Sequence, residues 1–263
     1  MKKIKLLLKI VIPILVVAIV AIAFARTPVL RKIPVSTAAI VPPLENGPEY
    51  TAHDEALLRE LMGVYGRIDS CAELYLVGTF EAHDPVDSTA QLHHQFRFCK
   101  KKKECYYQSG DDEIIALENV YISVSKPTKK IFVGPARKML SPFKMATDSM
   151  VDIWRKDNYR IETSELPGKT MVRMLCSNHI TCKEYRYEYD PLGRTLKSFY
   201  MKLTNLNDPL NPAMDREVSM SISQWREKDL PANLLREESY LTKRETGWEP
   251  APAYSDYTLI SLF

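Results

Sequence analysis

The chain has 263 residues, of which 45% are hydrophobic and 10% aromatic, so it has enough apolar side chains to form a folded core. Its formal charge is +3, but four of its 36 basic residues are lysines within the first nine positions, which leaves 32 basic against 33 acidic residues. A nearly neutral remainder produces no global basic field, and this excludes nucleic acid as a partner.

The first 26 residues predict a membrane-directed segment. An uncharged apolar run over 10–25 follows four lysines, Lys2, Lys3, Lys5 and Lys9, and ends before Arg26. A run that is apolar on all sides does not form a surface helix. Counted from Leu6, it reaches the ~20 residues that span a bilayer, because the long side chain of Lys9 can extend to the interface. We therefore expect a transmembrane helix over 1–26.

The alternative is a cleaved secretory signal, because 21–23 and 23–25 both have the small-x-small form of a cleavage site. The length of the run, and Arg26 directly after the second site, favour a retained signal-anchor. The lysines favour an N-terminus inside the cell. We therefore expect a single-pass protein of the bacterial inner membrane with the bulk of the chain in the periplasm, or a periplasmic protein if the segment is cleaved.

Residues 27–50 contain five prolines and no regular apolar period, which indicates an extended tether. The exported domain is then expected over 51–263. Its first element is a helix over about 52–69, where acidic Asp54 and Glu55 occupy the first turn and leucines recur at helical spacing. A second helix is expected over 141–157, with Ser141 as the N-cap and Pro142 in the first helical position.

Strand-like runs fill most of the remaining domain. They lie within 73–134, between the two helices, and within 158–225, and they alternate or cluster β-branched and aromatic residues between turn signals. The last residues, 257–263, are expected to add an edge strand. Short turns between neighbouring strands favour antiparallel meanders. The sequence therefore predicts an α+β fold in which a strongly curved antiparallel sheet, like a half-open barrel, packs against two helices.

The five cysteines include two pairs with the spacing C-x5-C, Cys99 with Cys105 and Cys176 with Cys182. Each pair brackets a short polar stretch between two strand-like runs. A hairpin with a five-residue loop places such residues opposite one another, at a distance near that of a disulfide. In an oxidising compartment we expect two hairpin-closing disulfides. Reduced buried thiols are the alternative, and the spacing is too wide for a usual structural zinc site.

The candidate binding residues are apolar and lie in and before the second helix: Met139, Phe143, Met145, Met150 and Trp154. Methionine-rich surfaces accommodate variable apolar guests, although an ordinary filled core gives the same pattern. The hairpin tip carries four lysines, which either touch anionic lipid headgroups at a membrane surface or form a charged, solvated turn: Lys100, Lys101, Lys102 and Lys103. No residue pattern predicts a metal site or a cofactor.

The hairpins resemble those of LolA/LolB-like periplasmic lipoprotein carriers. The closest segment runs from Gln95 to Gly134 and combines an aromatic strand, a basic turn and the sequence YYQSG; the segment YEYDPLGRTLKSFYMKLT resembles a later hairpin of these families. The resemblance implies a half-open barrel with helices at its mouth. The long proline-rich tether and the cysteine pairs have no counterpart in the soluble carriers.

Two functions follow as expectations. The first is a non-enzymatic, membrane-anchored envelope protein whose LolA-like domain binds an apolar ligand, lipid or lipoprotein. The second is a scaffold subunit of an envelope-spanning assembly, such as a bacterial secretion system, that recruits envelope protein partners by strand addition. The chain has no G-x-S-x-G, H-E-x-x-H, P-loop or G-x-G-x-x-G motif, so we do not expect an enzyme.

Overall fold

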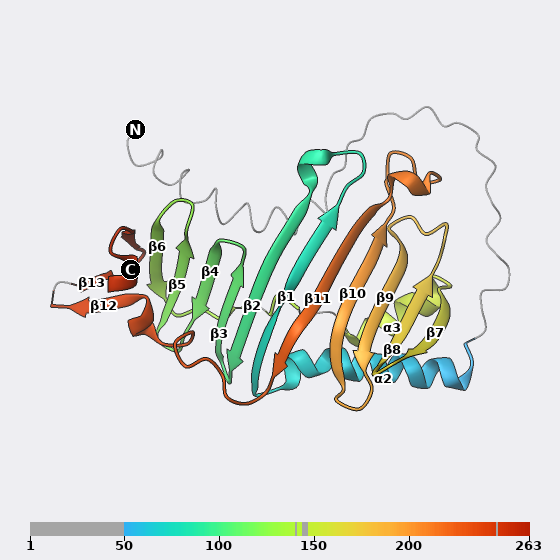
Figure 1. The fold of residues 1–263 in the computed structure, drawn as a ribbon, viewed down its shortest axis with the longest axis horizontal. Coiled ribbons are helices and arrows are strands. Elements are labelled where there is room, and N and C mark those ends of the chain that lie inside the picture. The colour runs from blue at the N-terminus through green and yellow to red at the C-terminus, as the bar shows by residue number, and fades with distance from the viewer. Residues whose placement is uncertain (1–49, 140, 144–146, 246) are drawn as a thin grey trace. The chain divides into compact units, whose positions relative to one another are not determined.

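The computed structural model describes residues 50–263 apart from 140, 144–146 and 246 (Figure 1). These residues belong to one compact unit, Asn46–Phe263. The transmembrane helix expected over 1–26, and all but the last residue of the tether expected over 27–50, lie outside the described residues. Within the described part, neither helix is long and apolar enough to cross a membrane.

The described residues form two α-helices, a series of strands and four short 3₁₀ helices. The helices are α2 (Ala52–Ser70) and α3 (Thr147–Lys156), and the 3₁₀ helices are η1 (Ser88–Ala90), η2 (Pro212–Met214), η3 (Glu237–Ser239) and η4 (Pro252–Tyr254). The strands are β1 (Glu73–His83), β2 (Leu92–Lys101), β3 (Glu104–Ser109), β4 (Asp112–Ala116), β5 (Val120–Ser125), β6 (Lys130–Pro135), β7 (Arg160–Leu166), β8 (Lys169–Leu175), β9 (Cys182–Asp190), β10 (Thr195–Leu203), β11 (Arg216–Arg226), β12 (Leu241–Arg244), β13 (Gly247–Pro250) and β14 (Thr258–Ser261).

Twelve strands form one curved sheet in the order β14-β6-β5-β4-β3-β2-β1-β11-β10-β9-β8-β7, and β12 pairs with β13 in a separate hairpin (Figure 1). Neighbouring strands are antiparallel, except that β14 lies parallel to β6. The sheet is not closed, because β14 and β7 each have a neighbour on one side only. The predicted curved sheet with two packed helices is confirmed, as is the edge strand at the end of the chain.

Helix α2 forms where its sequence predicts it. Thr51 and Asp54 form a capping box, in which the Thr51 hydroxyl oxygen accepts from the Asp54 amide at 3.1 Å and the Thr51 amide donates to the Asp54 carboxylate at 2.9 Å. The buried side of the helix carries Leu57, Leu58, Leu61, Val64, Tyr65 and Ile68. This apolar stripe fixes which side of α2 faces the sheet.

The second helix is shorter than predicted. Ser141 does accept a hydrogen bond from the amide of Phe143, at 3.3 Å, but the two residues after it form a turn and α3 begins only at Thr147. Trp154 near its end is fully buried. The predicted helix start at Ser141 and Pro142 is therefore wrong, because a serine side chain stabilises a turn with the same bond that it makes at a helix N-terminus.

A hydrophobic core lies on each face of the sheet. On one face, α2 and α3 cover strands β8–β11, β1 and β2, and the contact includes an edge-on pair of Tyr65 and Tyr187 with ring centres 6.4 Å apart. On the other face, Leu234, Tyr240 and Leu241 of the C-terminal region cover β1–β6. We call these the helix face and the tail face of the sheet.

The predicted disulfide between Cys99 and Cys105 is absent, because the β2–β3 turn is shorter than expected. Cys99 pairs with Tyr106 and Lys100 pairs with Cys105, which leaves only two residues in the turn. Successive strand residues point to opposite faces. Cys99 therefore belongs to the core of the tail face, whereas Cys105 packs against the core of the helix face.

The second predicted bridge, between Cys176 and Cys182, fails in the same way. Leu175 pairs with Glu184, and the Cys176 amide donates to Lys183 at 2.9 Å, so Cys182 lies one register position away from Cys176. All five cysteines are free thiols in this structure. The cysteines therefore agree with the alternative prediction, that of reduced and largely buried thiols.

Candidate ligand-binding pocket

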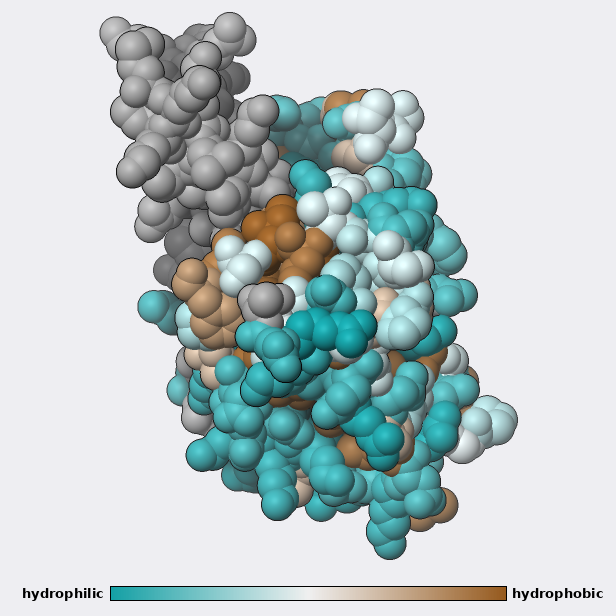
Figure 2. Space-filling model, turned by 90° about the vertical axis from the view of Figure 1, so that its left-hand side faces the viewer, coloured by the Kyte–Doolittle hydropathy of each residue, from teal (hydrophilic) through white to brown (hydrophobic). Residues whose placement is uncertain are grey.

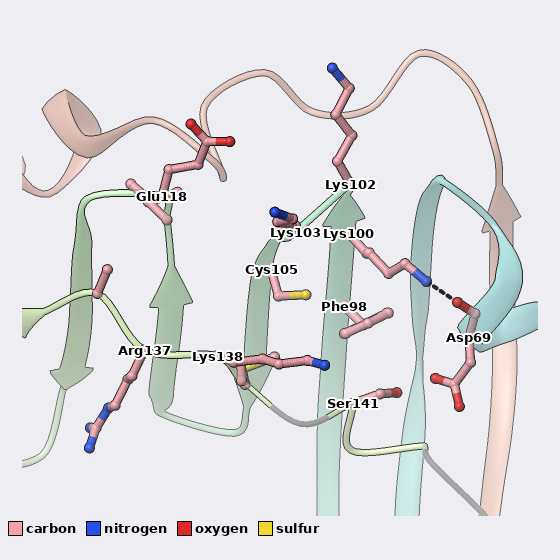
Figure 3. Close-up of a pocket in the computed structure, with 13 residues that line it drawn as sticks. Asp69, Phe98, Lys100, Lys102, Lys103, Cys105, Glu118, Arg137, Lys138 and Ser141 are labelled. Atoms are coloured by element: carbon pink, nitrogen blue, oxygen red, sulfur yellow. Dashed lines mark hydrogen bonds between the residues drawn. The ribbon is translucent and has the colours of Figure 1, made fainter.

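A pocket of about 900 Å³ opens on the helix face, beside the C-terminal end of α2 (Figure 3). The β2–β3 hairpin forms one of its walls, and residues 136–139 and Ser141, which follow β6, form another. The hairpin is fixed to the end of the helix, because the Lys102 amide donates to the carbonyl of Ala72 at 2.7 Å. The pocket therefore lies where the sheet continues beyond the cover of α2.

The floor of the pocket is apolar. Phe98, Cys105, Leu117 and Met139 line it. Phe98 is fully buried and pairs across the hairpin with Tyr107, and both rings pack edge-on against Phe143, with centroid distances of 5.3 and 6.3 Å. This aromatic cluster joins the pocket floor to the core of the helix face.

Basic side chains surround this floor. The pocket is lined by five basic residues, Lys100, Lys102, Lys103, Arg137 and Lys138, and by two acidic ones, Asp69 and Glu118. The Lys100 ammonium donates to the carbonyls of Ile68, at 3.3 Å, and of Asp69, at the end of α2 (Figure 3). A cation is favourable there, because the helix dipole is negative at the C-terminus. The guanidinium of Arg137 lies 3.6 Å from the ring centre of Tyr121.

The remaining three lysines have no such partner. Within the described residues, no hydrogen bond or ion pair involves the side chains of Lys102, Lys103 or Lys138, all of which are exposed. Figure 3 shows the Lys138 side chain extending toward Phe98 and Ser141, whereas Arg137 points the other way. The pocket therefore combines an apolar floor with cations available to a ligand.

The Cys105 thiol at this floor is not an activated nucleophile. Burial raises its pKa, although the nearby Lys100 charge opposes the shift. Burial also raises the pKa of Cys99, to about 12, on the other face of the same hairpin. Both side chains stay protonated at neutral pH, and a protonated buried thiol behaves as a small apolar group. Within the described residues, no three His, Cys, Asp or Glu side chains gather as a metal site.

The structure separates the five predicted binding residues. Met139 lines the pocket, and Phe143 supports its floor. Met150 packs, half-buried, against the core of the helix face, and Trp154 is buried within that core. Met145 lies outside the described residues.

The four lysines predicted to meet a membrane surface have different environments. The Lys100 ammonium donates to a backbone carbonyl at the end of α2. The Lys101 ammonium lies 3.8 Å from the Glu73 carboxylate on the neighbouring strand. Lys102 and Lys103 form the exposed turn, with the Lys102 backbone in the left-handed region at φ 55°. The turn thus contributes to the rim of a pocket, which its sequence did not indicate.

The residues that the sequence interpretation missed are Phe98, Arg137 and Lys138. A signal for Phe98 was present, because Phe96, Phe98 and Lys100 alternate on one face of a strand that ends in a basic turn. The adjacent cations Arg137 and Lys138 directly precede Met139. No local pattern indicated that these two segments meet.

A second pocket, of about 370 Å³, lies between the ends of β1, β2, β10 and β11. Its lining is mostly polar and includes His83, His93, Tyr200 and Glu217. The exposed His93 ring lies 2.9 Å from the Glu81 carboxylate. The second pocket is the smaller of the two, and its apolar side chains are only Ala82 and Leu92, so the pocket at the β2–β3 hairpin is the better site for a long apolar ligand.

No protein-family model and no curated protein matches the sequence. Among solved structures, an uncharacterised conserved protein from Thermus thermophilus is similar over 77% of this chain and 98% of that chain, at 9% identity and a TM-score of 0.38. A DUF1329 family protein from Desulfovibrio piger is similar over 70% and 98%, at 10% identity and a TM-score of 0.28. A LolA superfamily protein from Nitrosomonas europaea is similar over 69% and 98%, at 9% identity and a TM-score of 0.22. The solved structures similar to this chain thus include a LolA superfamily protein, at low TM-score.

Proposed function

We propose that this chain is a non-enzymatic, membrane-anchored protein of the cell envelope that binds an apolar ligand, a lipid or a lipoprotein. The observation that carries the proposal is the pocket at the β2–β3 hairpin. Its volume of about 900 Å³ and its floor of Phe98 and Met139 suit an acyl chain, because small-molecule sites are concave and mostly apolar, with volumes of roughly 300–1,000 Å³.

The location in the envelope rests on the N-terminal sequence. The lysines before the apolar run over 10–25, and the proline-rich stretch over 27–50, support an anchor that holds the domain near the outer face of the bacterial inner membrane. In this proposal the bulk of the chain lies in the periplasm. A fixed binding protein of this kind receives or presents its ligand beside the membrane instead of carrying it away.

Labelling with a photoactivatable alkyl probe tests the pocket. The full-length chain, purified in amphipol, is irradiated with a diazirine-bearing long-chain alkane, and the labelled peptides are identified by mass spectrometry. We expect labels within 96–105 and 136–139. Met139→Glu places a carboxylate at the floor and should lower this labelling several-fold, because an alkyl chain that covers the floor would remove this charge from water.

The matched control is Leu210→Glu, which makes the same chemical change at a side chain that is 77% exposed in the β10–β11 loop. It should leave the labelling unchanged. Equal labelling in the two variants, or labels spread over the whole surface, would contradict the proposal.

The alternative function is a scaffold subunit of an envelope-spanning assembly. The observation in its favour is β7, an edge strand whose side chains are mostly exposed and whose outer backbone edge has no neighbouring strand within the described sheet. Crosslinking in intact membranes separates the two functions. A stable complex crosslinked through 160–166 supports the scaffold, whereas labelling of the pocket without such a complex supports the ligand-binding protein.

A further inference from the structure

We propose that the pocket selects an acyl-chain amphiphile whose headgroup is negatively charged. The chain lies against Cys105 and Met139, above the buried ring of Phe98, and the headgroup lies among Lys103 and Lys138. This inference rests on the proposed function and adds the chemical class of the ligand. It follows from how apolar and basic side chains are placed around one cavity.

The two kinds of side chain come from the same two segments. Strand β2 places Phe98 at the floor and ends in the turn that carries Lys102 and Lys103. The segment after β6 places Met139 at the floor and Lys138 directly before it. A ligand that follows the floor between these segments therefore has ammonium groups beside it at the rim.

The charge around the pocket is unbalanced. Five basic side chains surround the pocket with two acidic ones, and among the residues that the structure describes only Lys100 and Arg137 have protein partners that account for their positions. The Lys138 ammonium extends over the pocket toward Phe98 (Figure 3). An ordinary solvated turn explains Lys102 and Lys103, but it does not explain why a cation from a distant segment extends over the same apolar floor.

The arrangement discriminates by charge. A carboxylate or phosphate headgroup gains charge-assisted hydrogen bonds from lysine ammonium groups. A neutral headgroup gains no comparable bonds, although its acyl chain still contacts the floor. A small anion without a chain gains no contact with the apolar floor.

Competition for the photoactivatable label tests this selectivity in the full-length chain. The competitors are palmitate, methyl palmitate and inorganic phosphate. We expect palmitate to displace the label at roughly tenfold lower concentration than the ester does. A roughly tenfold difference is what one good charge-assisted hydrogen bond contributes to affinity. Inorganic phosphate should not displace it. Added salt should weaken the binding of palmitate and leave the binding of the ester unchanged. The rim is exposed to solvent, and salt screens only the charged headgroup.

The variant Lys103→Gln/Lys138→Gln should remove most of the preference for palmitate while the ester binds as before. The control Lys130→Gln/Lys197→Gln removes two exposed lysines that do not line the pocket, and it should keep the preference. Equal displacement by palmitate and ester in the unaltered chain would overturn the inference and leave the proposed function standing. Displacement by phosphate would also overturn it, whereas failure of every amphiphile to bind would remove the proposed function itself.

Discussion

Two buried tyrosines of the helix face, Tyr159 and Tyr187, differ in what their hydroxyl groups contact. The Tyr159 hydroxyl donates to the carbonyl of Cys182. The Tyr187 hydroxyl has no hydrogen-bond partner among the described residues, and neither has the indole nitrogen of Trp154, whose ring centre lies 6.2 Å from that of Tyr187. A buried polar group without a partner loses its hydration and gains nothing in return.

We therefore expect opposite results from removing the two hydroxyl groups. Tyr187→Phe keeps the ring packing and removes an unpaired polar atom, so the free energy of unfolding should stay the same or rise slightly. Tyr159→Phe also keeps its ring, but it removes the donor to a buried carbonyl and should cost about 1–3 kcal/mol. Urea unfolding followed by circular dichroism measures both. A loss for Tyr187→Phe as large as that for Tyr159→Phe would mean that the Tyr187 hydroxyl is bonded.

The cysteines show how far the spacing of residues in the sequence predicts the contacts of single side chains. The C-x5-C spacing correctly placed each pair at the end of a hairpin, but a disulfide depends on whether the turn holds an odd or an even number of residues. Lys102 and Lys103 form a two-residue turn, which shifts Cys99 and Cys105 to opposite faces. Nothing in the intervening lysines and glutamate distinguishes the two turn lengths.

Among the elements, the loop between β10 and β11 is organised by a buried ion pair. The Lys183 ammonium, on β9, lies 2.9 and 3.1 Å from the two carboxylate oxygens of Asp215 and donates to the carbonyl of Pro209 at 2.8 Å. Both side chains are buried. The carboxylate also accepts from the Asn205 amide at 3.4 Å. One lysine thus fixes the end and the middle of the loop to the sheet.

Breaking this pair should be costly. Asp215→Asn leaves the Lys183 charge buried without a counter-charge, and we expect a loss of about 3–5 kcal/mol in the free energy of unfolding. The control Asp208→Asn makes the same change at a half-exposed position of the loop and should be nearly neutral. Urea unfolding measures the loss, and amide hydrogen exchange over 205–214 should rise for Asp215→Asn alone. If Asp215→Asn leaves the free energy of unfolding unchanged, then Lys183 is held by its other contacts.

The helices show where sequence rules succeed and where they need tertiary information. Thr51 and Asp54 determine the start of α2, because both partners of the capping box lie within one turn. Ser141 and Pro142 carry the same kind of signal, but here the chain must first fold Phe143 onto Phe98. That contact joins segments distant in the sequence, which a local capping signal does not specify, and α3 begins at Thr147.

At the scale of the domain, the pocket could be predicted only in pieces. Met139 and the basic turn at Lys102 and Lys103 were both identified from local patterns. Their meeting depends on how the strands between them, β3–β6, bring residues 136–139 back to the end of α2. The parallel pairing of β14 with β6 is equally non-local, since it joins the last residues of the chain to a strand near its middle.

This parallel pairing protects one edge of the sheet. Strand β6 carries the fully buried side chains of Ile131 and Val133, and β14 covers its outer edge, where the Leu262 amide donates to Val133 and the Thr258 amide to Lys129, both at 2.8 Å. Figure 2 shows the domain from this side, with apolar surface gathered in one area among mostly hydrophilic residues. The exposed apolar residues of the chain end include Leu262 and Phe263.

Removing 258–263 should therefore expose an apolar strand with unpaired backbone groups, which is a template for pairing with a second chain. We expect the truncated protein to form dimers or larger species at concentrations where the full chain does not, as measured by size-exclusion chromatography with light scattering. Deletion of Phe263 alone is the control, because it removes a side chain that is 70% exposed and leaves β14 in place. If the truncated protein keeps the elution and mass of the full chain, then β6 is protected by its own twist and by the tail face, and β14 is not what prevents edge-to-edge association.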